Sequence, residues 1–131
     1  MKYAVIGAGG MGIQYGVLLQ EFAHKDVDFI DTWKPNVEKI REQGGAYVSQ
    51  DGEDRHLVPI NVYYPEEYAG QPDVWIVFLK QMQLGGVLKR CAHLFNEKQI
   101  VFSAMNGYGH FEKLNEYFSN CLLYTSDAAD E

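Results

Sequence analysis

Short apolar runs alternate with stretches of helical spacing along the first part of this chain. Residues 2–6 form a short apolar run that ends in glycines, which is typical of a buried parallel strand, and residues 27–30 predict a second strand. The stretch between them predicts an amphipathic helix from apolar positions at helical spacing, namely Met11, Tyr15, Leu18, Leu19 and Phe22. Pro35 suits the first turn of a second helix, and Gly44 followed by Gly45 ends it. Residues 1–45 therefore predict strand, helix, strand, helix.

The middle of the chain carries a hairpin signal. Residues 46–49 and 57–64 are rich in residues that favour strands, and they flank the turn sequence Asp51-Gly52. Pro59 and Pro65 cannot donate hydrogen bonds to a sheet. We therefore expect an inserted edge hairpin here rather than a central pair of strands.

The remaining pattern returns to alternating strands and helices. Residues 74–79 form a nearly unbroken apolar strand, and residues 99–103 form another. The helix between them is marked by Val87, Leu88, Cys91, Ala92, Leu94 and Phe95. A loop opens at Asn106-Gly107, and residues 111–118 have helical spacing. The alternation predicts an α/β fold, a Rossmann-type doubly wound, mostly parallel sheet with an inserted β-hairpin.

Composition narrows the classes of function. The chain has 131 residues and a formal net charge of -7, which argues against nucleic acid or an anionic membrane as the main partner. No stretch reaches the ~18 apolar residues of a membrane helix. Cys91 and Cys121 lack the spacing of a metal or redox site. We expect a cytoplasmic protein with free thiols, no metal, and no nucleic-acid or membrane partner.

The segment 121–131 differs in kind from the rest of the chain. Its sequence, CLLYTSDAADE, resembles a translation of a transposase adapter used in DNA library preparation. A match over the whole segment is hard to reach by chance. We therefore expect residues 121–131 to be an artefactual tail and the natural protein to continue past Asn120.

A glycine-rich loop joins the first predicted strand to the first predicted helix. Gly7 permits a tight turn, Gly9 lets the backbone approach a pyrophosphate, and Gly12 lets the helix pack closely on the strand. The N-terminus of the helix adds free N–H groups and partial positive charge. Because a strand precedes the motif and a helix follows it, the motif predicts a dinucleotide site. The residues of this site are Gly7, Ala8, Gly9, Gly10, Met11 and Gly12.

Asp31 lies 19 residues after Gly12, at the end of the second predicted strand. A carboxylate at this position accepts hydrogen bonds from the adenosine ribose and repels a 2'-phosphate. Asp31 therefore favours NAD over NADP as the cofactor. The nearby Lys34 could soften this preference.

Lys80 and Asn106 follow later strands, at the carboxyl ends where open α/β sheets bind ligands. The lysine would face a phosphate, a ribose or an acid. The amide of Asn106 can bind a ribose, a carboxamide or a substrate oxygen. A solvent-exposed lysine and a turn asparagine are the alternatives. We interpret Trp33 and Trp75 as packing residues, and the histidines lack ligand spacing.

Three segments together resemble the ketopantoate reductase family. They are residues 2–12, Leu79-Lys80-Gln81-Met82-Gln83, and Met105-Asn106-Gly107-Tyr108-Gly109, in the order and spacing of that family. The predicted hairpin resembles the one that the family inserts before its fourth core strand. The resemblance covers about Met1 to Phe118, and the lysine and asparagine segments are much more specific than the glycine loop.

This resemblance implies reduction of 2-dehydropantoate to pantoate with a nicotinamide cofactor, on the route to pantothenate and coenzyme A. Family residues matching Lys80 and Asn106 contact the cofactor, and the asparagine also lies beside the substrate. The family's catalytic lysine belongs to a helical C-terminal domain. We therefore expect residues 1–120 to be a truncated dinucleotide-binding domain with no catalytic residue, inactive alone, whose full-length parent could form a homodimer.

The chain departs from the family pattern after the second strand. Asp31-Thr32-Trp33-Lys34 stands where many members carry an arginine for the 2'-phosphate of NADP. This puts NADP specificity in doubt and leaves other 2-oxo acids open as substrates. Two alternatives remain: another two-domain dehydrogenase of hydroxyacyl-CoA or opine type, and a non-catalytic NAD-sensing module. The asparagine at the nicotinamide end argues against the sensing module.

Overall fold

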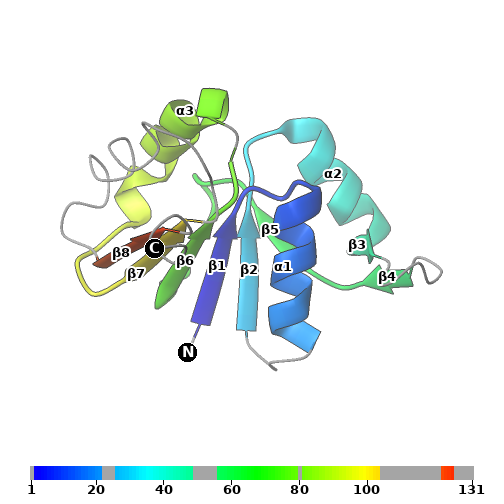
Figure 1. Ribbon diagram of the computed structural model, residues 1–131. Helices are drawn as coiled ribbons and strands as arrows, with labels where there is room; N and C mark the ends of the chain where they lie inside the picture. Colours follow the sequence, from blue (N-terminus) through cyan, green and yellow to red (C-terminus); the bar gives the residue numbers. More distant parts are fainter. Residues whose placement is uncertain (1, 22–25, 49–55, 80, 104–121, 126–131) are drawn as a thin grey trace.

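One parallel sheet organises the chain. The computed structural model describes residues 2–21, 26–48, 56–79, 81–103 and 122–125 (Figure 1). Six strands pair in the order β5-β2-β1-β6-β7-β8, and every pair is parallel. Their bounds are β1 Lys2–Ile6, β2 Asp26–Ile30, β5 Asn61–Tyr63, β6 Val74–Val77, β7 Ile100–Ser103 and β8 Leu122–Thr125. This confirms the predicted doubly wound sheet, in which the strand order reverses at β1.

Helices cover both faces of the sheet, because the inner strands are buried at consecutive positions and therefore on both faces. Helices α1 (Gly10–Glu21) and α2 (Lys34–Gln43) lie on one face, and α3 (Gln81–Cys91) lies on the other (Figure 1). One apolar core joins α2 to β1 and β2 through Val37, Val5 and Phe29. The opposite core joins α3 to β6 through Leu88 and Trp75. Strand residues therefore alternate between two separate cores.

Helix α2 begins and ends where the sequence predicts. Pro35 occupies its first turn, where the missing N–H costs no hydrogen bond. Gly44 ends it in the left-handed conformation, with φ 82°. The N–H groups of Gly44 and Gly45 both donate to the carbonyl of Ile40 at 3.0 Å, which satisfies the end of the helix.

The inserted hairpin is confirmed, but its second strand is shorter than predicted. Strands β3 (Ala46–Val48) and β4 (His56–Val58) pair antiparallel in a separate sheet, and Asp51-Gly52 lies outside the described residues. The single run predicted for residues 57–64 is wrong: it divides into β4 and β5, and β5 joins the main sheet beside β2. Pro59 separates the two because it has no N–H for a ladder. The hairpin packs on α1 through Val17, Val48 and Val58.

The pattern identified helix α1 but not its buried side. Tyr15 and Leu18, expected on the apolar side, are 39% and 46% exposed. The helix instead approaches the sheet through Gly16, where an added Cβ would lie 2.2 Å from the ring of Phe29. Glycine permits this close contact because it has no side chain, yet it adds nothing to an apolar pattern.

The later elements also differ in part from expectation. Helix α3 ends at Cys91, and Ala92–Leu94 continue as a 3-10 helix. Trp75 is fully buried, as a packing residue should be, whereas the same interpretation of Trp33 is wrong because Trp33 is 63% exposed. Strand β8 lies within the segment expected to be a tail. The helix predicted for residues 111–118 lies outside the described residues.

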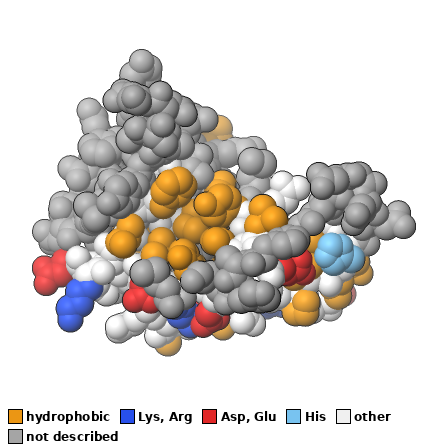
Figure 2. Space-filling view, turned by 60° about the horizontal axis from the view of Figure 1, so that its bottom comes forward, with side chains coloured by type: hydrophobic (Ala, Val, Ile, Leu, Met, Phe, Trp, Pro, Cys, Tyr) orange, Lys and Arg blue, Asp and Glu red, His pale blue; other side chains and the backbone are white. Residues whose placement is uncertain are grey.

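The surface is unequally covered around β7. Val101 and Ser103 are buried on one side of this strand, whereas Ile100 and Phe102 on the other side are only half-buried. Hydrophobic side chains gather at the centre of the surface shown in Figure 2.

Within the described part of the chain, no helix is long and apolar enough to cross a membrane. That part also holds no metal-binding cluster of histidine, cysteine or acidic residues.

Candidate dinucleotide-binding site

The carboxyl edge of the sheet brings the glycine loop and Asp31 together. The N–H of Gly7, just after β1, donates to the carbonyl of Ile30, the last residue of β2, at 2.7 Å. Asp31 follows directly. Beside them, the N–H of Phe78 donates to the carbonyl of Ile6 at 2.9 Å, so the end of β6 borders the same loop. This is the point of reversed strand order, where open α/β sheets bind ligands.

The fold itself requires Gly7 and Gly12. Gly7 has φ +107°, and a Cβ there would lie 2.1 Å from the carbonyl oxygen of Phe78. A Cβ on Gly12 would lie 2.1 Å from the carbonyl oxygen of Gly7. Both contacts are with backbone atoms that have no room to move. These glycines are therefore explained by the tight turn and by the close approach of α1.

Gly9 differs from these two glycines. It is exposed, its φ lies outside the left-handed region, and a Cβ there would meet nothing within 4 Å. Neither the backbone conformation nor a neighbouring atom requires glycine at this position. A ligand that approaches the backbone closely would give one, because a Cβ would fill the space that the ligand needs.

The N-terminus of α1 opens beside Gly9. The first hydrogen bond of the helix runs from the N–H of Ile13 to the carbonyl of Gly9 at 2.9 Å, so the N–H groups before Ile13 have no acceptor within the helix. The first turn contains no acidic residue. An open backbone cradle at a positive helix end fits the pyrophosphate of a dinucleotide.

The carboxylate of Asp31 is held by three donors. Its Oδ1 accepts the backbone N–H of Thr32 at 2.8 Å and that of Trp33 at 3.4 Å. Its Oδ2 accepts the side-chain amide of Asn36 at 2.9 Å. The carboxylate is thereby fixed in orientation, and Oδ2 keeps an acceptor position for a ligand hydroxyl. A fixed acceptor at the end of β2 suits the ribose of an adenosine.

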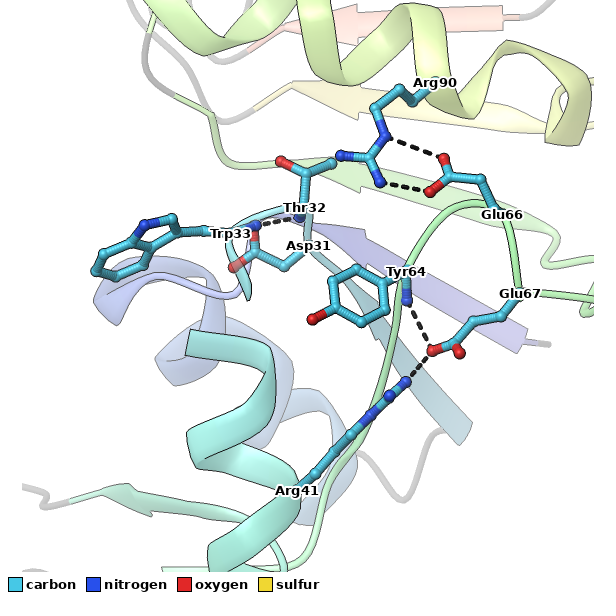
Figure 3. A network of polar contacts seen from close by, with 8 residues as sticks. All are labelled: Asp31, Thr32, Trp33, Arg41, Tyr64, Glu66, Glu67 and Arg90. Carbon is cyan, nitrogen blue, oxygen red and sulfur yellow. Dashed lines mark hydrogen bonds and ion pairs between the residues drawn. The ribbon is translucent and has the colours of Figure 1, made fainter. Parts of the chain in front are cut away.

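Three cations on helices α2 and α3 are paired with carboxylates. Lys34 lies 3.8 Å from Glu38 on the same helix. Arg41 pairs with Glu67, and Arg90 holds Glu66 through two nitrogens, one of them Nε at 3.0 Å (Figure 3).

The Arg90 guanidinium lowers the pKa of the Glu66 carboxyl through their hydrogen bond, and the same bond raises the pKa of Arg90. Each of these three cations is thus already engaged by a carboxylate within the described chain.

The structure brings the glycine loop and Asp31 to one edge of the sheet, together with Asn36, which sequence reasoning missed. Lys80 and Asn106 lie outside the described residues, although the strands that precede them, β6 and β7, pair from Val74 to Val77. The amide of Asn36 also donates to the carbonyl of Ala8 at 2.7 Å. An asparagine one residue after Pro35 gave no sign of this contact in the sequence.

The fold and this edge of the sheet define a class, the NAD(P)-binding Rossmann domains of oxidoreductases. The comparison with known families identifies the member of that class: the chain matches the family "Ketopantoate reductase PanE/ApbA" over residues 3–127. The chain belongs to this family. The resemblance found in the sequence is thus confirmed.

Individual relatives agree with this assignment. The chain is 31% identical to the 2-dehydropantoate 2-reductase of Lactococcus lactis over 126 residues, covering 95% of this chain and 39% of that protein. It is 34% identical to the enzyme of the same name from Nostoc, covering 88% of this chain and 35% of that protein. The chain therefore spans less than half the length of these relatives.

Solved structures show the same fold. A crystal structure named as a 2-dehydropantoate 2-reductase from Enterococcus faecalis superposes with a TM-score of 0.79 at 33% identity, covering 94% of this chain and 40% of that one. A ternary structure of D-mandelate dehydrogenase with NADH and anilino(oxo)acetate gives a TM-score of 0.86 at 29% identity, covering 95% and 40%. Both are similar to this chain across its length.

Proposed function

We propose that this chain is the cofactor-binding domain of a reductase that transfers hydride from NADH to a 2-oxo acid such as 2-dehydropantoate. The observation that carries the proposal is Gly9, an exposed glycine that the fold does not require and that a pyrophosphate would. The names of the Lactococcus and Nostoc relatives support the substrate class. The D-mandelate dehydrogenase complex, which contains NADH and an oxoacetate, supports the same chemistry.

The residues have separate tasks in this proposal. The loop from Gly7 to Gly12 and the N-terminus of α1 hold the pyrophosphate, and Asp31 holds the adenosine ribose. The bound nicotinamide supplies the hydride, so the protein contributes binding and orientation. Lys80 and Asn106 contact the cofactor, and Asn106 also contacts the substrate. No described residue is given a catalytic role, and we expect no reduction of ketopantoate by this chain alone.

NADH is favoured over NADPH in this proposal. Asp31 offers an acceptor oxygen, and a carboxylate repels a 2'-phosphate. Lys34 and Arg41 on α2 already pair with Glu38 and Glu67. The preference is tested by calorimetric titration of the chain with NADH and with NADPH. Equal or tighter binding of NADPH would contradict it.

The glycine argument has its own test, the Gly9→Ala variant. Its Cβ meets no protein atom, so the unfolding midpoint should fall by no more than the small cost of alanine at a helix N-cap. NADH binding should weaken by about tenfold or more, equivalent to about 1.4 kcal/mol. Gly86→Ala on α3 is the matched control, because a Cβ there also meets nothing within 4 Å. Unchanged NADH affinity in Gly9→Ala would overturn the proposed site.

A second variant tests the nicotinamide end. Asn106→Ala should weaken binding of NADH but leave binding of ADP unchanged, because ADP lacks both the nicotinamide and the ribose that carries it. If neither affinity changes, the proposed place of Asn106 is wrong.

A further inference from the structure

Asn36 connects two parts of the site that are far apart in the sequence. Its side-chain nitrogen donates to the backbone carbonyl of Ala8, in the glycine loop, at 2.7 Å. The same nitrogen donates to Oδ2 of Asp31 at 2.9 Å. Both partners are acceptors only, so the NH2 end of the amide must face them, and both of its hydrogens are used. The orientation of the amide is therefore fixed by chemistry.

The position of Asn36 on α2 is itself fixed. Its backbone N–H donates to the carbonyl of Trp33 at 3.1 Å in the first turn of the helix. Val37, the next residue, is fully buried in the core below. The side chain thus starts from a rigid point and is half-buried between the helix and the loop. Rigid support of this kind holds a binding group in one geometry.

We propose that Asn36 is a positioning residue that sets the preference for NADH by holding Asp31 against the glycine loop. The inference rests on the proposed function, since it assigns Asn36 a role in that same site. The bond to Oδ2 turns the carboxylate so that its remaining acceptor position is available to the adenosine ribose. The bond to Ala8 fixes the distance between the ribose acceptor and the pyrophosphate loop. The ligand class is therefore an adenine dinucleotide with a free ribose 2'-hydroxyl.

The proposal predicts a change in discrimination rather than a general loss of binding. In Asn36→Ala, Asp31 loses one of its three donors and its orientation relaxes. NADH binding should weaken by about tenfold, whereas NADPH binding, which does not use the ribose acceptor, should change by less than about threefold. A purely structural role would weaken both equally. Lys39→Ala, at an exposed position of the same helix, is the matched control.

Asp31→Ala separates this inference from the proposed function. If Asn36 acts through Asp31, adding Asn36→Ala to Asp31→Ala should not change the NADH-to-NADPH ratio further. Asn36→Asp is the second variant if Asn36→Ala fails to fold. It keeps the shape of the side chain but places a carboxylate against Asp31. The ratio of NADH affinity to NADPH affinity should again fall by about tenfold.

The outcomes are distinct. Asp31→Ala could lose the preference for NADH over NADPH while Asn36→Ala and Asn36→Asp keep it in full. That result would overturn the role of Asn36 alone. Equal weakening of both dinucleotides in the Asn36 variants also overturns it. Failure of the parent chain to bind either dinucleotide overturns the proposed function instead.

Discussion

The hydroxyl of Tyr68 donates a hydrogen bond of 2.8 Å to Oδ2 of Asp28 inside the core. The two residues are 40 positions apart in sequence and only 6% and 4% exposed. The same oxygen lies 3.0 Å from the ammonium group of Lys2, the first residue of β1. A buried carboxylate on a central strand is thus satisfied by a cation and a phenol.

Tyr68→Phe tests how much this contact stabilises the fold. The variant leaves the ring in place but removes a donor to a buried carboxylate, so the free energy of unfolding at neutral pH should fall by about 1.5–3 kcal/mol. Tyr15→Phe, on a ring that is 39% exposed, is the matched control. Urea denaturation of both variants gives the comparison. An equal loss of unfolding free energy in both variants would show that the hydrogen bond to Asp28 adds no measurable stability.

The same pair predicts the response to alkaline pH. Burial, with the bond to Asp28, raises the pKa of Tyr68 far above its ordinary value of 10.0. A group whose pKa is raised by folding stabilises fully below the unfolded pKa and loses that effect as pH rises. Stability should therefore fall above about pH 10, and Tyr68→Phe should make this fall shallower. An identical slope in parent and variant would contradict the assignment to Tyr68.

The parallel core of this fold could be predicted because its strands are short and mostly apolar. β1 and β6 are buried almost throughout, and such runs bounded by glycine or polar residues have few other interpretations. The division of residues 57–64 between two sheets could not be predicted. It depends on Asn61 pairing with Asp28 in β2, a contact between distant strands that the local pattern does not contain.

The candidate site likewise contains residues that the local sequence predicts and one that it does not. The spacing of Gly7, Gly9 and Gly12 predicted the loop, and two of these glycines answer a local requirement, Gly7 a tight turn and Gly12 a close helix contact. Asn36 could not be found in this way. One of its partners is a backbone carbonyl 28 residues away, which any residue at position 8 would offer. Only the folded chain reveals such a contact.

Two helical glycines should respond in opposite ways to alanine. Gly16 on α1 approaches the ring of Phe29, and an added Cβ would lie 2.2 Å from it, so Gly16→Ala should destabilise by about 1–3 kcal/mol through overpacking. Gly86 on α3 has open space, so Gly86→Ala should stabilise by about 0.5–1 kcal/mol through helix propensity. Thermal unfolding of both variants measures the difference. Stabilisation by Gly16→Ala would show that α1 does not pack this closely.

Cys91 should be an unreactive thiol in the folded chain. It is fully buried at the C-terminal end of α3, and burial raises its pKa from 9.0 to about 12, which disfavours the reactive thiolate. In a Cys121→Ser background, where Cys91 is the remaining cysteine, a disulfide reagent at pH 8 should react only as fast as the chain unfolds. Adding urea should accelerate the reaction to that of a free thiol. Rapid modification without denaturant would contradict the burial of Cys91.

Glu66 and Glu67 lie in one turn and form ion pairs with helices on opposite faces of the sheet. Glu66 pairs with Arg90 of α3 and Glu67 pairs with Arg41 of α2, whose guanidinium also lies 5.2 Å from the ring centre of Tyr64 (Figure 3). These side chains are between 42% and 57% exposed, so water and salt screen both pairs.

Glu66→Gln and Glu67→Gln should therefore each lower the free energy of unfolding by less than about 1 kcal/mol at low salt, with the difference from the parent shrinking in 1 M salt. Denaturation at both salt concentrations measures the effect, with Glu38→Gln, in the exposed pair on α2, as the control. A loss above about 2 kcal/mol that persists in high salt would mean that the turn is held by these charges rather than by the apolar packing of Tyr68.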